Sequence, residues 1–351
     1  LKSWTIILAL STFILSMSGT FLVRSGILNS VHTFANDPER GIFVLIFLTV
    51  LILISLTIYF KYNDIEKLTR SFLLSKESAI VINNWFMMYF LGVVLVGTIY
   101  PIFLEVITKE KISVGPPYFN QLIIPFLIPF LFIMAIGPKL DWIKNKKFDA
   151  KFTKIILLIL SILISYLIAK NFNTQVLYST LLISAALYLF FISITDLKNE
   201  KLKLSQKISH TAFSILIISI ILNSLFSEEV SVNLKKGEEK QLSNYLLKFE
   251  NISKMEIDNF TSLKAEIHVI HNDNKLKFYP ELRLYKVPET ITSEADIKTS
   301  LFSDNLVVVN YLKDTNYLNI RYQKKPFMLL IWLSAIMLAV GGLIGLKKNF
   351  K

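Results

Sequence analysis

The feature that most constrains this chain is a series of long, uninterrupted apolar runs separated by mostly short polar connections. Each run is about 17–22 residues long, enough for a helix to cross a hydrocarbon core of about 30 Å. The runs are residues 4–22, 41–60, 83–104, 119–136, 152–169, 176–194, 208–226 and 326–346. Backbone polar groups inside lipid must be satisfied within the segment, so each run is predicted to be an α-helix. We therefore expect an α-helical polytopic membrane protein with about eight transmembrane helices.

Composition and charge agree with a membrane protein. Hydrophobic residues make up 53% of the chain and charged residues only 18%, against about 25% charged in average soluble domains. The net charge of +12 is concentrated as lysines in connections between apolar runs, which is a topology signal, so nucleic-acid binding is not predicted. The chain has no Cys, which excludes thiolate metal sites and disulfides within it.

The distribution of lysines predicts the orientation in the membrane. Connections 61–82, 137–151 and 196–207 and the C-terminal tail are rich in lysine, whereas the alternate connections are poor in basic residues. The positive-inside rule then places both termini on the cytoplasmic or matrix side. The long polar connection 227–325 lies on the opposite side.

This long connection is predicted to be a small β-rich extracytoplasmic domain between the last two helices. It has alternating stretches at 264–270, 276–285 and 305–311, separated by turn signals such as 271–274 and Val287-Pro288. The predicted organisation is a seven-helix bundle over 1–226, the β-rich domain over 227–325, and a final helix with a basic tail over 326–351.

Two of the four histidines are candidate metal ligands. His32 follows the first run, at the edge of an apolar stripe of Ile27, Val31 and Phe34 that predicts a short helix on the membrane surface. His210 lies at the start of the seventh run, and ionisable residues in spans are candidate functional sites. An ordinary interfacial role remains open for both. The predicted orientation puts them on opposite membrane faces, so they cannot share one ion.

Other candidates have weaker patterns. His268 and His271 fall three apart in a strand-like stretch, so they point to opposite faces and are expected to be surface residues without a shared metal. Arg24 ends the first run, where a guanidinium can bind a carboxylate such as a haem propionate or anchor to lipid headgroups. Gly341 and Gly345 have the spacing of a helix-packing motif. Phosphate-binding loops and the motifs of zinc proteases, serine hydrolases and dinucleotide enzymes are absent.

One segment carries a family resemblance. The run Ser18-Gly-Thr-Phe-Leu-Val-Arg-Ser-Gly-Ile-Leu-Asn-Ser-Val-His-Thr-Phe-Ala-Asn-Asp-Pro-Glu-Arg-Gly41 resembles the hallmark stretch of the CcmF family. Similar segments continue along the chain: Gly-Pro-Pro-Tyr-Phe-Asn at 115–120, Ser-His-Thr-Ala-Phe at 209–213, Tyr-Pro-Glu-Leu-Arg-Leu-Tyr at 279–285 and Lys-Pro at 325–326. The resemblance thus covers essentially the whole chain.

The resemblance implies a role in cytochrome c maturation. CcmF-like proteins receive haem from a CcmE-type haem chaperone outside the membrane and, with a CcmH-type subunit, attach it to apocytochrome c. By match, His32 would ligate the delivered haem and His210 would be one axial ligand of a haem b within the membrane. If haem binds there, the guanidinium of Arg24 is the expected propionate partner on chemical grounds. The implied location is a bacterial inner membrane with the outer domain in the periplasm, or alternatively the mitochondrial inner membrane.

The sequence also departs from the family. The tryptophan-rich WWD stretch and the two histidines that partner His32 and His210 are missing, and the chain begins with Leu. It therefore resembles the C-terminal half of the family protein, as a split gene product or a fragment. Each haem then receives one ligand from this chain. Alone, the chain is expected to bind haem weakly and to lack lyase activity, and it would need the WWD-containing N-terminal half.

Two other functions remain open. A haem transporter, or haem-handling membrane protein, would need a polar path at mid-membrane, and the runs are nearly free of ionisable residues at depth. A non-catalytic assembly platform would dock apocytochrome c on the outer domain. In that case His32 and His210 could be replaced without loss, whereas deletion of 227–325 would abolish function.

Overall fold

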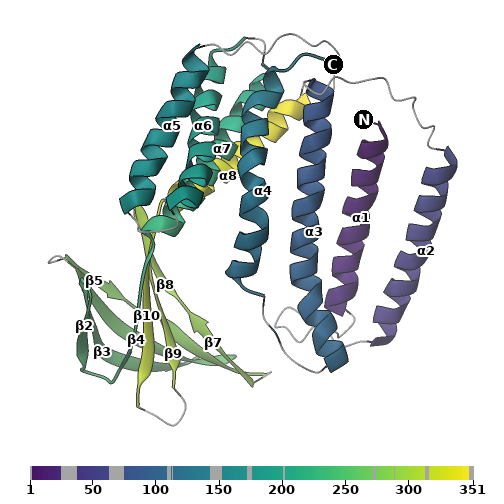
Figure 1. Cartoon of the computed structure of the whole chain (residues 1–351). Helices are drawn as coiled ribbons and strands as arrows, with labels where there is room; N and C mark the ends of the chain where they lie inside the picture. The colour runs from purple at the N-terminus through teal and green to yellow at the C-terminus, as the bar shows by residue number, and fades with distance from the viewer. Residues whose placement is uncertain are drawn as a thin grey trace. The chain divides into compact units, whose positions relative to one another are not determined.

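The computed structural model describes residues 2–24, 38–62, 75–108, 112, 114–142, 152–171, 176–200, 202–271, 274–287, 289–312 and 316–347. Eight long helices and ten strands occur within these ranges (Figure 1). The helices are α1 (Lys2–Arg24), α2 (Pro38–Tyr62), α3 (Lys76–Thr108), α4 (Pro116–Ile136), α5 (Phe152–Asn171), α6 (Val176–Leu197), α7 (Leu204–Phe226) and α8 (Met328–Lys347), and a short 3-10 helix η1 (Gly137–Lys139) follows α4.

All eight helices are long and apolar enough to span a membrane. The predicted fold class, a polytopic helical membrane protein with a β-rich domain before its last helix, is confirmed. Several helix boundaries differ from the prediction. Helix α3 begins at Lys76 and continues through Pro101 to Thr108, so it is longer at both ends than the predicted run 83–104. Pro326 was expected in the last helix but ends a strand, and α8 begins at Met328.

The chain divides into two compact units, residues 1–160 and 161–351. In the first unit, α3 and α4 form a hairpin with an aromatic interface. The Tyr89 hydroxyl donates a hydrogen bond to the Leu122 carbonyl at 3.0 Å, and the Phe86 and Phe90 rings both meet Phe130 edge-on. Gly97 lets the two helices approach, since a Cβ there would lie 2.8 Å from the Tyr118 ring.

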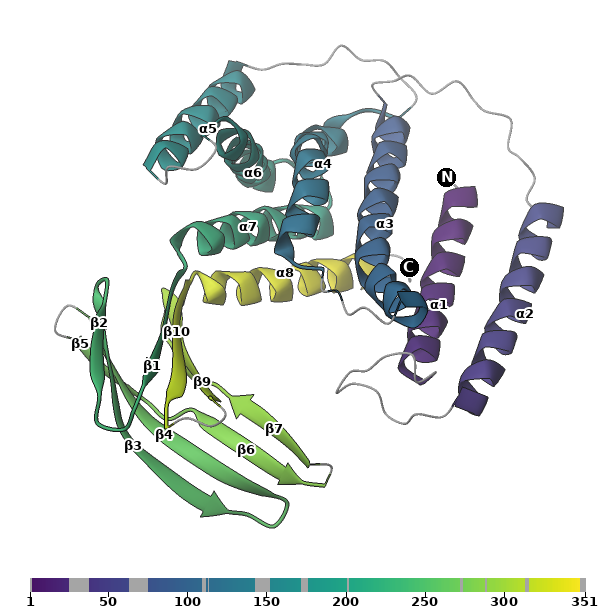
Figure 2. The same cartoon turned by 60° about the horizontal axis from the view of Figure 1, so that its bottom comes forward.

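In the second unit, α7 and α8 pack closely along their length (Figure 2). Small residues make this approach possible. A Cβ on Gly341 of α8 would overlap the Ser209 hydroxyl of α7, and one on Gly345 would lie 3.6 Å from the Ser205 Cβ. Helix α6 also packs on α7, and its buried face is likewise rich in Ser and Ala. The glycine spacing noted in the sequence is therefore a helix contact.

The β-rich domain is a sandwich of two antiparallel sheets between α7 and α8. Its strands are β1 (Glu228–Leu234), β2 (Glu239–Leu242), β3 (Tyr245–Glu256), β4 (Phe260–His271), β5 (Asn274–Phe278), β6 (Glu281–Lys286), β7 (Glu289–Glu294), β8 (Asp296–Thr299), β9 (Ser303–Tyr311) and β10 (Leu318–Pro326). One sheet has the order β1-β10-β9-β8, and the other has β2-β3-β4-β6-β7 with β5 also on β4.

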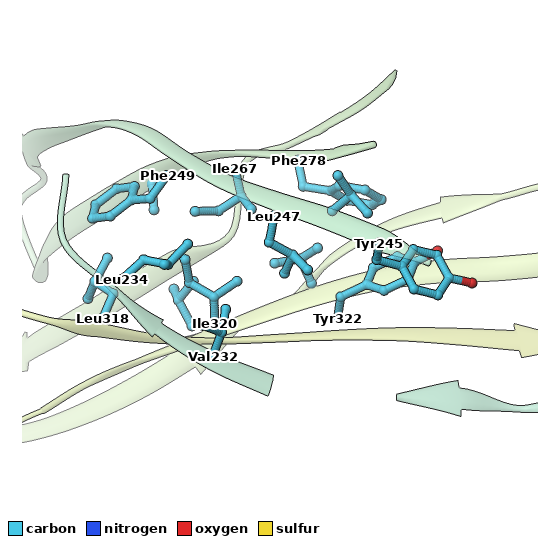
Figure 3. Close-up of a cluster of buried hydrophobic side chains, with 14 of the residues drawn as sticks. Val232, Leu234, Tyr245, Leu247, Phe249, Ile267, Phe278, Leu318, Ile320 and Tyr322 are labelled. Carbon is cyan, nitrogen blue, oxygen red and sulfur yellow. The ribbon is translucent and has the colours of Figure 1, made fainter. Parts of the chain in front are cut away.

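The core of the sandwich is formed by the inward faces of both sheets (Figure 3). Alternate residues such as Leu247, Ile267 and Ile320 are fully buried, as the period of two along a strand requires. The predicted alternating stretch at 276–285 is in fact two strands. Pro280 separates β5 from β6, because proline cannot donate a ladder hydrogen bond.

A short junction ties the sandwich to the two helices that carry it. Helix α7 leads into β1 and β10 leads into α8, and these two strands are paired, with Glu228 opposite Lys324. The Asn223 side chain donates a hydrogen bond to the Pro326 carbonyl at 2.6 Å. The Phe226 and Phe327 rings also meet, with centroids 6.2 Å apart. The sandwich therefore begins and ends at one point of the helix pair.

Candidate functional site

His210 lies on α7, six residues after the helix begins and sixteen before it ends at the sandwich. At 1.5 Å per residue this is about 9 Å from one end of the helix and about 24 Å from the other. The imidazole is half-buried. His210 therefore sits inside the span, near the end that is remote from the sandwich.

Both sequence neighbours of His210 are in packed positions. Ser209 is the residue that Gly341 of α8 approaches, and Thr211 is only 8% exposed, with no hydrogen-bond partner for its hydroxyl. The α7 backbone at His210 is thus fixed by its surroundings. Packing of a helix holds its side chains in precise positions, as a side chain that ligates a metal requires.

The other two predicted site residues have side chains outside the described part of the structure. His32 lies outside the described residues, together with the short surface helix predicted around it. Arg24 is the last residue of α1, and its side chain lies outside the described part.

His268 differs from its prediction as a surface residue, because it is only 4% exposed. It lies on the outer face of β4, since its neighbours Ile267 and Val269 both point into the core. Its two ring nitrogens each lie 3.0 Å from a carboxylate, Glu250 on one side and Glu266 on the other. These long charged side chains cover the imidazole, a burial that a strand pattern alone does not reveal.

His271 lies on the opposite face from His268, as their spacing predicts. Its ring stacks on Tyr245 at a centroid distance of 4.5 Å, and its Nδ1 is 2.9 Å from the Asn244 carbonyl. Among the described residues, no group of three or more His, Cys, Asp or Glu side chains could hold a metal ion. Within that part of the chain, His210 is the histidine that lies in a membrane span.

Sequence reasoning missed a polar cluster at the helix end of the sandwich. The Tyr245 hydroxyl donates a 2.6 Å hydrogen bond to Glu228, and the Tyr322 hydroxyl donates one of 2.9 Å to Asn305. Burial raises the pKa of Tyr322 to about 12. Burial, followed by the hydrogen bond to Glu228, also raises the pKa of Tyr245. Both phenols therefore stay protonated and serve as hydrogen-bond donors.

Known proteins match this chain along essentially its whole length. Residues 225–326 match the family model of the CcmF C-terminal β-sandwich. The cytochrome c-type biogenesis protein CcmF of Pseudomonas fluorescens is 32% identical over 98% of this chain, and that of Pseudomonas aeruginosa is 31% identical over 100%. The CcmF of Escherichia coli is 29% identical over 98% of the chain.

A solved structure agrees with these matches in fold. The structure titled cytochrome c heme lyase CcmF superposes with a TM-score of 0.74 over 98% of this chain, at 15% sequence identity. The chain spans only about half of its relatives, 54% of the Pseudomonas fluorescens protein and 54% of the solved chain. This chain thus belongs to the CcmF family and corresponds to the C-terminal portion of its longer members.

Proposed function

We propose that this chain acts in cytochrome c maturation as the C-terminal part of a membrane haem lyase. The observation that carries the proposal is the similarity to CcmF proteins over 98% of the chain. In this role the assembled protein receives haem from a CcmE-type chaperone and attaches it to apocytochrome c, with a CcmH-type subunit as partner. The relatives are bacterial, which supports a bacterial inner membrane with the sandwich in the periplasm.

His210 is proposed as one axial ligand of a resident haem b. A neutral imidazole is a common haem ligand, and the half-buried position of His210 within a span supports the role. The tight contact of Ser209 with Gly341 holds the α7 backbone, so the imidazole is oriented by packing. When bound, the haem would supply one-electron chemistry for reducing the iron of delivered haem, and the protein supplies position and electrostatics.

The substrate haem is proposed to bind on the sandwich side of the membrane. His32 would be one of its ligands, and Arg24 would pair with a propionate by bidentate hydrogen bonds. If each helix crosses once, the end of α1 at Arg24 and the end of α7 at Phe226 share one membrane face. The second ligand of each haem would come from the N-terminal, WWD-containing half, so this chain alone is expected to be inactive.

The test is the visible spectrum of the reduced, purified chain, alone and co-expressed with a candidate N-terminal half. We expect a b-type haem signal in the pair only, lost on His210→Ala and retained in the control His271→Ala, whose histidine lies in the sandwich. Strong stoichiometric bis-histidine haem in the isolated chain would contradict the shared-ligand proposal. Absence of haem in both samples, with apocytochrome c still bound, would instead indicate an assembly platform.

A further inference from the structure

The turn between β8 and β9 presents two large apolar side chains at its tip. Leu301 is 74% exposed and Phe302 is 77% exposed. An isolated exposed Leu is ordinary on a protein surface. Here a Leu and a Phe are adjacent at the end of a hairpin, a position usually filled by polar turn residues.

The backbone of this turn is largely satisfied by its own residues. The Ser300 amide and hydroxyl both donate to the Ser303 carbonyl, at 3.0 Å and 2.7 Å. The Ser303 amide in turn donates to the Ser300 hydroxyl at 3.1 Å. Polar backbone groups without partners are costly in an apolar medium. A turn closed in this way can therefore present Leu301 and Phe302 to an apolar phase at low cost.

The position of the turn is fixed against the start of α8. The Phe327 amide donates a 2.9 Å hydrogen bond to the Phe302 carbonyl, and Phe327 directly precedes Met328, where a membrane span begins. Phe327 adopts a left-handed backbone conformation with φ 61°, and its ring contacts Phe226, the last residue of the α7 span. The tip thus lies where two spans leave the hydrocarbon.

We propose that Leu301 and Phe302 insert into the outer-leaflet interface and anchor the sandwich to the lipid surface. The apolar phase that these side chains enter is the bilayer itself, because the tip lies beside the ends of two helices that the bilayer surrounds. The anchor adds a third attachment beside α7 and α8. With three attachments the sandwich cannot rotate freely about the helix pair, so one of its faces stays turned toward the membrane.

The chain has no cysteine, so a single introduced cysteine can be spin-labelled without first removing native ones. Leu301→Cys and the control Tyr311→Cys would be nitroxide-labelled in the full chain and reconstituted into phosphatidylcholine–phosphatidylglycerol vesicles. Tyr311 is 55% exposed and lies at the other end of the nine-residue strand β9, about 26 Å along the strand. We expect the label at 301 to be accessible to oxygen and protected from a water-soluble nickel chelate. The label at 311 should show the reverse.

Two results would overturn the anchor. Equal accessibility of both labels to the nickel chelate would place the turn in water. Protection of the 301 label from both oxygen and the chelate would mean that protein covers it. A parallel Phe302→Cys label should behave like the one at 301, and both measurements are independent of haem.

Discussion

At the residue scale, Tyr245 and Tyr322 link the start of β1 to the core of the sandwich. Their ring centroids lie 5.0 Å apart. The Tyr245 hydroxyl donates a hydrogen bond to Glu228, which lies two residues after the end of α7. Each buried phenol pairs its hydroxyl with an oxygen acceptor, as burial of a polar group requires. The polar cluster therefore depends on both hydroxyls keeping their protons.

We predict that the sandwich loses stability at alkaline pH. The usual pKa of tyrosine is about 10, whereas burial raises the pKa of Tyr322 to about 12. Below about pH 10 both states keep the proton, and the stabilisation is fully present. As pH rises from about 10 to about 12 the unfolded state deprotonates first, so the free energy of unfolding falls.

A near-ultraviolet titration of phenolate absorbance on the full chain in detergent would measure this pKa. Tyr322→Phe should remove one phenol that titrates near pH 12 and should weaken the alkaline loss of stability, while Tyr245 still contributes. The exposed Tyr311 offers a control, because Tyr311→Phe should leave the alkaline loss unchanged. A Tyr322 titrating at the usual tyrosine pKa would contradict the prediction.

At the scale of elements, the contact of α7 with α8 depends on the absence of a side chain at Gly341. A Cβ there would overlap the Ser209 hydroxyl and lie 3.1 Å from the Ser209 backbone nitrogen. A hydroxyl can rotate away, but a backbone atom of a packed helix cannot. The helices would have to separate to admit any side chain.

We predict that Gly341→Leu destabilises the helix pair by about 1–3 kcal/mol, the usual cost of overpacking. The matched control is Gly342→Leu, since a Cβ at Gly342 has no atom within 4 Å. Thermal unfolding of the two purified variants in the same detergent would compare them. Equal melting temperatures for both would refute the dependence on Gly341. With the N-terminal half present, Gly341→Leu should also weaken haem b binding at His210.

The elements differ in how far sequence alone predicts them. Apolar runs identify spans directly, because lipid demands a fixed length of apolar helix. Helix ends are less well defined by hydropathy: α3 opens with the polar residues Lys76, Glu77 and Ser78, and the prediction left out the apolar residues 79–82 together with them. Strands such as β1 and β10 were not predicted individually, since their inward faces depend on partners about ninety residues away in sequence.

The candidate site shows a similar division. His210 can be selected from sequence, because an ionisable residue in an apolar run is unusual. Its neighbour Ser209 cannot be matched to Gly341 without knowing how α7 and α8 pair. The burial of His268 could not be predicted either, because two side chains cover it: Glu250 on the adjacent strand β3 and Glu266 on the same strand, β4. Residue types in the sequence indicate which side chains can bind or react. Which side chains are buried and which are in contact can be known only from the folded structure.

At the scale of the whole molecule, the sandwich is an insertion with its two ends side by side. We predict that replacing residues 227–325 by a short Gly-Ser linker leaves α7 and α8 paired, because their ends already meet at Phe226 and Phe327. Co-expressed with an N-terminal half, this variant should keep the haem b spectrum and lose apocytochrome c capture. The unmodified pair is the control for both readouts. Loss of haem b in a folded variant would show that the sandwich is needed for the membrane haem.

The pairing of β1 with β10 also has a consequence for the order of assembly. Helices α7 and α8 are separated by about a hundred residues of chain, and closing so long a loop carries an entropic penalty. Glu228 lies beside Lys324 in the folded sandwich, so a sandwich that folds first would remove most of that penalty before α8 meets α7. The last helix would then complete its contact with α7 only after the sandwich has folded, which makes assembly of this helix pair dependent on folding of the domain inserted between its two helices.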